Sequence, residues 1–138
     1  IQKYDESDTL TMIVQESVES DDHIHVFVVG QKETLAVRYS PAEGVYRPEL
    51  GAISGEIVAQ VKEQAVAISR AYGYDMNLVE FVIRDGTAVV VSPSNPAPDM
   101  DINVLKPVHF SWCVNQLADF AIAVAQSPDG QMPQATWQ

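Results

Sequence analysis

The segment 79–99 combines a hairpin pattern with side chains that could bind a hard cation. Two runs rich in β-branched residues flank Asp85-Gly86, and the second run leads into a proline-spaced loop that carries Asn95. Glu80 and Ser92 are equally distant from the glycine, so an odd-numbered hairpin loop would put both side chains on one face of the sheet. A two-residue turn would put them on opposite faces. We expect the odd-numbered loop, with oxygen ligands from both strands.

This segment resembles the last hairpin of the ATP-grasp family, in which one acid on the first strand and a second acid plus an Asn at the end of the next hold the magnesium ions of ATP. The resemblance implies that Glu80 and Asn95 bind Mg²⁺. Ser92 stands where the family carries Asp or Glu, so it offers a neutral oxygen in place of an anion. Asp99 or Asp101 could substitute for the missing acid.

The resemblance extends over about residues 11 to 125. The turn Gly73-Tyr74-Asp75-Met76-Asn77 and the loop Asn95-Pro96-Ala97-Pro98-Asp99 are similar to those of an uncharacterised ATP-grasp subgroup related to glutathione synthase and to the ligase that adds glutamate to a ribosomal protein. The resemblance implies ATP and Mg²⁺ as cofactors. It also implies a small-molecule or peptide carboxylate as substrate.

Two further sites follow from the resemblance. The Val-Gln-Glu step is the family's hinge, whose backbone binds adenine and is followed by an acid that binds the ribose; the matching residues here are Gln15, Glu16, Ser17, Val18 and Glu19. A strand end with solvated acids remains the alternative. Arg38 ends a strand where related amine ligases carry a basic residue that faces the phosphates, and its fork of donors suits phosphate oxygens. The alternative is an ordinary exposed arginine, and Arg47 is a weaker candidate of the same type.

Three histidines and one cysteine have weaker chemical interpretations. His23 and His25 alternate along a predicted strand and so share a face, which is compatible with a transition metal but is more often an exposed strand pattern. His109 has no evident partner. Cys113 lies mid-helix in the prediction and is expected to be packed.

Composition limits the class of protein. The 138 residues suit one domain, 46% of them are hydrophobic, and the net charge of −11 with eight scattered Lys and Arg argues against nucleic acid binding. The single cysteine excludes an internal disulfide and suits a reducing cytoplasm. No run reads as a signal peptide or a membrane span. Because the first residue is Ile1, we expect a piece of a longer protein.

The apolar periodicity predicts five strands and two helices. Strands are expected at 11–17, 23–30 and 34–39 and in the hairpin, and residues 41–53 are expected to form a surface loop. One helix is expected from an N-cap at Ser54 to a stop at Gly73, and another is opened by Pro107. The buried stripe of this second helix is expected to contain Phe110, Val114, Leu117, Ala121 and Val124. We expect an α+β domain over residues 1–126, an antiparallel sheet with two helices packed on one face and the other face free for a ligand, followed by a polar tail at 127–138.

The leading functional hypothesis is the C-terminal, nucleotide- and Mg²⁺-binding half of an ATP-dependent carboxylate–amine or carboxylate–thiol ligase. The seven glycines form neither a Walker A sequence nor Gly-x-Gly-x-x-Gly, so upstream sequence is expected to cover the phosphates and this segment alone is expected to be inactive. A degenerate, non-catalytic ATP-grasp domain that binds a nucleotide or a partner is the alternative. A plain α+β interaction domain is a third possibility.

Overall fold

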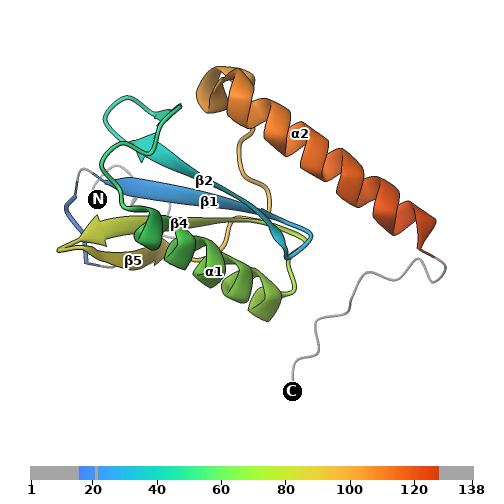
Figure 1. The fold of residues 1–138 in the computed structure, drawn as a ribbon, viewed down its shortest axis with the longest axis horizontal. Coiled ribbons are helices and arrows are strands. Elements are labelled where there is room, and N and C mark those ends of the chain that lie inside the picture. Colours follow the sequence, from blue (N-terminus) through green and yellow to red (C-terminus); the bar gives the residue numbers. More distant parts are fainter. Residues whose placement is uncertain (1–15, 21, 128–138) are drawn as a thin grey trace, which may run out of the picture.

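The computed structural model describes residues 16–20 and 22–127 and contains five strands and two helices there (Figure 1). The elements are β1 His23–Val29, β2 Glu33–Ser40, β3 Val45–Arg47, α1 Gly55–Tyr72, β4 Met76–Arg84, β5 Thr87–Ser92 and α2 Ile102–Gln126. All five strands form one antiparallel sheet in the order β3-β2-β1-β4-β5. The predicted α+β class and antiparallel sheet are confirmed.

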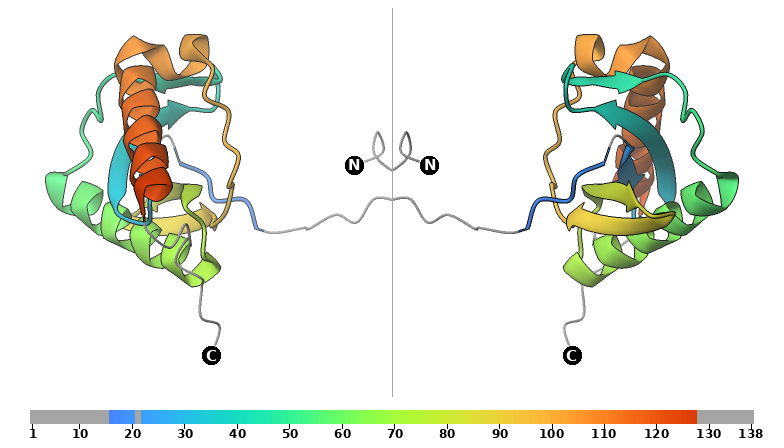
Figure 2. Two further views of the ribbon diagram at one scale, coloured as in Figure 1. Left: turned by 90° about the vertical axis from the view of Figure 1, so that its right-hand side faces the viewer. Right: turned by 90° about the vertical axis from the view of Figure 1, so that its left-hand side faces the viewer.

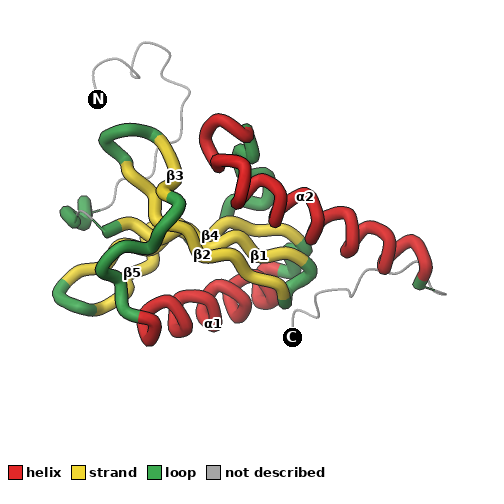
Figure 3. The backbone as a smooth tube through the Cα atoms, turned by 45° about the horizontal axis from the view of Figure 1, so that its top comes forward, coloured by secondary structure: helices red, strands yellow, loops and turns green. Residues whose placement is uncertain are grey.

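The central strand β1 is apolar on both of its faces and therefore has to be covered on both. Ile24, Val26 and Val28 pack with residues of α1, whereas Phe27 packs with residues of α2. The two helices consequently lie on opposite faces of the sheet, as Figures 2 and 3 show, with α1 on one side of the strands and α2 on the other. The expectation that both helices cover one face is corrected by this arrangement.

The ends of α1 are those that the sequence predicts. The Ser54 hydroxyl accepts a hydrogen bond from the Ile57 N–H at 3.3 Å and so satisfies one of the free donors of the first turn. At the other end Gly73 adopts a left-handed conformation with φ of 69°, and its N–H bonds the Arg70 carbonyl. Val61 and Ala65 face the sheet and are fully buried.

The structure differs from the sequence prediction at the loop expected at 41–53, and the strand expected at 11–17 lies mostly outside the described residues. The segment predicted as a surface loop contains β3, which pairs with β2 and buries Tyr46. The strand predicted at 11–17 falls mostly outside the described residues, and its last two residues, Glu16 and Ser17, belong to no strand. A three-residue strand between Gly44 and Pro48 is too short to produce a visible alternation.

Helix α2 starts earlier than the sequence predicts and buries a different face. Asp101 caps it, the helical path breaks at Lys106 with φ of 66°, and Pro107 then opens the longer part. Its buried residues are Leu105, His109 and Cys113, whereas Val114 from the predicted stripe is 47% exposed. The helix is apolar on all sides, so periodicity alone could not identify the buried one.

Neither helix in the described part of the chain has the length and apolar character needed to cross a membrane.

Candidate functional site

The hairpin places Glu80 and Ser92 directly opposite each other, but through a combination of turn and register shift that the sequence does not predict. Asp85 and Gly86 both have positive φ, 52° and 74°, and form a two-residue turn between Arg84 and Thr87, so the predicted odd-numbered loop is wrong. A β-bulge between the positions facing Glu80 and Phe81 then shifts the register by one residue. The bulge, not the turn, brings Glu80 and Ser92 into opposition, and directly opposed side chains lie on one face.

The face that carries Glu80 is the one that α2 covers in part. Helix α2 lies beside β1, β2 and β3. Among the described residues, the buried core under α2 takes Leu78 from β4 and nothing from β5. The side chain of Glu80 is 33% exposed, and Ser92 is half-buried. The pair is therefore partly exposed to solvent, on the β4–β5 part of the face that α2 does not cover.

Burial sets the charge states beside Glu80. Its carboxyl Oε2 lies 3.8 Å from His25 Nε2, but burial lowers the pKa of His25 to about 4, with a further contribution from the charge of His23. Burial also raises the pKa of Glu80, against the opposing effect of His23. Because its pKa is lowered to about 4, the His25 imidazole is neutral near pH 7. The 3.8 Å contact between His25 and Glu80 is therefore a polar contact and not an ion pair.

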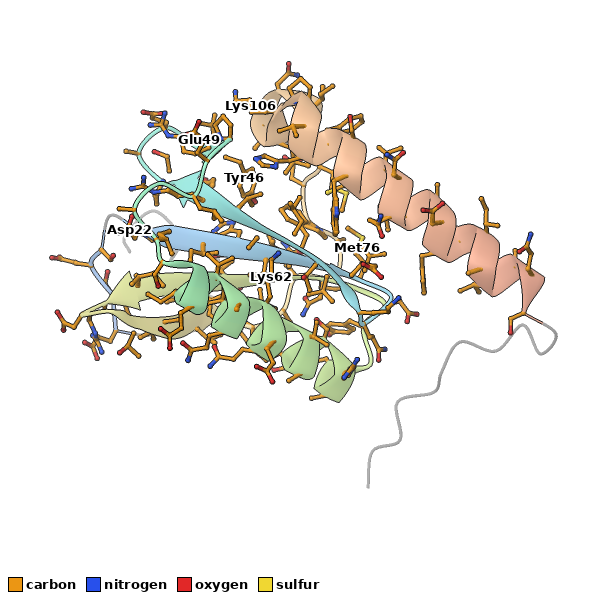
Figure 4. The ribbon with its side chains drawn as sticks, in the orientation of Figure 1. Asp22, Tyr46, Glu49, Lys62, Met76 and Lys106 are labelled. Atoms are coloured by element: carbon orange, nitrogen blue, oxygen red, sulfur yellow. The ribbon has the colours of Figure 1, made fainter. Side chains whose placement is uncertain are left out.

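An aromatic cluster of His25, Phe27, Tyr39 and Tyr46 lies next to Glu80. His25 Nδ1 is 3.0 Å from the Tyr46 hydroxyl, and the imidazole stacks on Tyr39 with ring centres 4.5 Å apart. Tyr46 lies between the sheet and the start of α2 (Figure 4). The sequence analysis missed this cluster because Tyr46 falls in the segment predicted as loop. Among the described residues, His23 and His25 belong to no group of three side chains that could hold a metal ion, and His25 is buried.

Asn95 is attached to β4 by its backbone. Its carbonyl accepts a hydrogen bond from the Leu78 N–H, and its N–H donates to the side-chain oxygen of Asn77, both at 2.9 Å. These bonds place Asn95 beside β4, two residues along the strand from Glu80. The sequence suggests Asn77 only as part of a family-like turn and not as a contact of Asn95, although an Asn within a strand of Val, Phe and Ile is unusual.

Arg38 does not share the face of Glu80. It lies opposite Ile24, whose side chain packs under α1, and its guanidinium is 2.8 Å from the Asp22 carboxylate. Its neighbour Tyr39 points to the Glu80 side. Arg47 lies opposite Arg38 and pairs with Glu43. Both arginines line an open cavity of about 640 Å³ near the end of β2.

The predicted adenine and ribose residues occupy an irregular segment before β1. Gln15 lies outside the described residues, while Glu16 Oε1 is 3.6 Å from Arg84 Nη1. Ser17, Val18 and Glu19 line an open hollow of about 580 Å³ together with Ser20 and His23. Nothing in their geometry distinguishes a nucleotide site from a solvated strand end, so these roles stay predictions.

The donor set at the hairpin fits a hard cation that takes its remaining ligands from elsewhere. In residues 16–20 and 22–127, no group of three His, Cys, Asp or Glu side chains could hold a metal ion. The hairpin offers the Glu80 carboxylate with the neutral oxygen of Ser92 opposite it, and Asn95 follows in the next loop with its Oδ1 on the Ala97 N–H. Mg²⁺ commonly uses one or two carboxylates plus phosphates and waters. Asp99 and Asp101 each accept one backbone N–H where the chain enters α2, which leaves a second carboxylate oxygen on each, so their predicted role as substitutes stays a prediction.

Comparison with known proteins identifies the fold. The chain matches no protein-family model and no curated protein sequence. It superimposes on the crystal structure of D-alanine–D-alanine ligase from Bacillus anthracis complexed with ATP, with a TM-score of 0.54 and 17% identity, over 79% of this chain. The described part of the chain therefore shares the fold of part of that ligase. The match spans 40% of the ligase chain, and it does not test the resemblance to the glutathione synthase-like subgroup.

Proposed function

We propose that this chain is the C-terminal, nucleotide- and Mg²⁺-binding half of an ATP-dependent carboxylate–amine or carboxylate–thiol ligase. The observation that carries the proposal is the opposition of Glu80 and Ser92 on the open part of the α2 face, in a fold that an ATP-bound ligase shares. In such a reaction the γ-phosphoryl group of ATP passes to the substrate carboxylate. The amine or thiol then displaces phosphate from the acyl phosphate.

In this proposal Glu80 contributes the negative charge toward Mg²⁺, and Ser92 and Asn95 contribute neutral oxygens. Bound Mg²⁺ would neutralise phosphate charge, which is the main requirement of phosphoryl transfer. The segment Gln15 to Glu19 would contact adenine and ribose. Arg38 would need to reach the phosphates around the end of β2, because its strand position directs it to the α1 face. The structure therefore gives less support to a catalytic role for Arg38 than to a metal-binding role for Glu80.

Ser92 favours one alternative, a non-catalytic ATP-grasp domain that binds nucleotide as a scaffold. A site with a single carboxylate holds a divalent cation less tightly than one with two. The alternative domain would bind a nucleotide or a partner, and it differs from the ligase in having no turnover.

Isothermal titration of the full-length natural protein with ATP, in MgCl₂ and in EDTA, tests the proposal. We expect Mg²⁺ to tighten ATP binding, and we expect Glu80→Gln to remove most of that gain. Asp85→Asn is the matched control, because it removes one carboxylate from the exposed turn of the same hairpin. ATP binding that is indifferent to Mg²⁺ and to Glu80→Gln would contradict the metal role. ATP-dependent ADP release separates the ligase from the scaffold.

A further inference from the structure

We infer that Asn77 is a positioning residue that fixes the loop carrying Asn95 and so sets the metal-facing oxygen of that residue. Asn77 lies in β4 and is fully buried, with 0% of its surface exposed. Its side chain contacts helix α1 and two points of the loop after β5. The inference rests on the proposed function, because it concerns the predicted role of Asn95 toward Mg²⁺.

The hydrogen bonds of Asn77 define a single orientation of its amide. The Nδ2 group donates to Ser69 Oγ and to the Pro93 carbonyl, each at 3.2 Å. Ser69 donates its own proton to the Ala65 carbonyl at 2.8 Å, so it is available to Asn77 as an acceptor. The Pro93 carbonyl can only accept. Oδ1 of Asn77 is thereby directed to the Asn95 N–H, which it accepts at 2.9 Å.

The loop offers few other points of attachment. Pro93, Pro96 and Pro98 have no backbone N–H, which leaves few donors in this stretch. Asn95 uses its N–H on the Asn77 side chain and its carbonyl on the Leu78 N–H. Its own Oδ1 accepts the Ala97 N–H at 3.2 Å, which defines the direction of the side chain in the absence of a ligand. Asn77 therefore holds both Pro93, two residues before Asn95, and Asn95 itself.

A purely structural role for Asn77 predicts a loss of stability and nothing else. A positioning role predicts in addition that Mg²⁺ binding weakens while nucleotide binding without metal does not. Loss of a residue that orients a metal ligand typically lowers metal affinity by about 10–100-fold. The two roles are separated by the ratio of ADP affinity in MgCl₂ to ADP affinity in EDTA.

The experiment measures this ratio by calorimetry on the full-length natural protein, with ADP as the probe so that no turnover occurs. We expect Asn77→Ser to lower the ratio about tenfold and to leave the affinity in EDTA unchanged. Hydrogen exchange of the Asn95 N–H should accelerate. Ser69→Ala is the matched control, because it removes the helix contact of Asn77 and leaves both loop contacts. It should lower the melting temperature without changing the ratio.

Asn95→Ala and Asn77→Thr complete the test. If Asn95→Ala lowers the ratio and Asn77→Ser does not, the positioning role is overturned and the proposed function stands. If Asn95→Ala leaves the ratio unchanged, Asn95 has no metal role and the inference is overturned with that part of the proposed function. Asn77→Thr replaces the Ser variant if that protein does not fold, since Thr suits a strand and is too short to bridge the loop; the same tenfold loss is expected.

Discussion

The face of the sheet under α1 is mostly apolar and covered, whereas the face under α2 carries the aromatic cluster and Glu80 and is covered in part. Ile24, Val26, Val79 and Phe81 on the first face are fully buried against α1. The second face carries the aromatic cluster and Glu80, and its β4–β5 part is not covered by α2. Stability therefore depends most on the α1 face, and a ligand can reach the α2 face.

Substitutions at two neighbouring residues of β4, which point to opposite faces of the sheet, should show the largest difference in stability between the two faces. Phe81→Ala should lower the free energy of unfolding by about 3–5 kcal/mol, because it removes a fully buried ring from the α1 face. Glu80→Gln, one residue away on the other face, should change it by less than about 1 kcal/mol. Urea denaturation measures both. Equal losses would show that the two faces contribute alike to stability.

The pH dependence of stability should come in part from the α2 face. The folded pKa of His25 is lowered to about 4, so between pH 6.5 and 4 the unfolded state binds the proton and the folded state does not. Stability attributable to His25 therefore falls as the pH drops through this window, by up to about 3 kcal/mol. His25→Asn should flatten the slope in denaturation curves recorded from pH 7 to 4.

The raised pKa of Glu80 acts in the opposite direction, since its deprotonation destabilises the folded state as pH rises above the ordinary value. Measuring His25→Asn in a Glu80→Gln background removes that contribution. A slope that His25→Asn leaves unchanged in that background would contradict the buried neutral imidazole.

Two glycines test how the far part of α2 is attached. Gly30 and Gly44 both have positive φ, 60° and 67°, but a Cβ at Gly30 would lie 2.9 Å from Cδ2 of Phe120, whereas a Cβ at Gly44 would meet nothing within 4 Å. Gly44→Ala should cost about 1 kcal/mol from backbone strain alone. Gly30→Ala should cost about 1 kcal/mol more, because Phe120 has to move. Thermal melts of both variants measure the difference, and equal melting temperatures would show that the contact with Phe120 does not hold α2.

The sequence predicts the parts of the fold that local chemistry determines. Ser54 and Gly73 mark α1 because caps act within one turn, and Asp85-Gly86 marks the hairpin because that dipeptide readily adopts positive φ. The bulge opposite Glu80 could not be predicted, because nothing local to Thr87–Ser92 distinguishes a shifted register from a regular one. The assignment of α2 to the second face also depends on contacts far apart in sequence, such as the 3.1 Å contact of His109 Nε2 with the Arg47 carbonyl.

The same distinction applies to the candidate site. Glu80 and Asn95 are predicted from the resemblance of the hairpin and its following loop, but their positions depend on the bulge and on Asn77, which become visible only in three dimensions. For Arg38 the structure gives less support to the predicted role toward the phosphates. Its residue type suits a phosphate, while its position in β2 directs it away from Glu80.

The central claim, that Glu80 and Ser92 face one cation, is tested most directly by restoring a carboxylate at position 92. Ser92→Asp adds a charge beside Glu80, and Thr87→Asp adds the same charge to the far end of β5, opposite Arg84. The parent should bind Mg²⁺ weakly in the presence of nucleotide. Repulsion between the two carboxylates should lower the melting temperature of metal-free Ser92→Asp slightly.

Mg²⁺ titrations of the full-length natural protein and of both variants, each saturated with ADP, decide the matter. We expect Ser92→Asp to bind Mg²⁺ about tenfold more tightly than the parent, a difference of about 1.4 kcal/mol, and Thr87→Asp to bind it as the parent does. Equal affinities for the parent and Ser92→Asp would contradict the account, because Ser92 would then not face the ion.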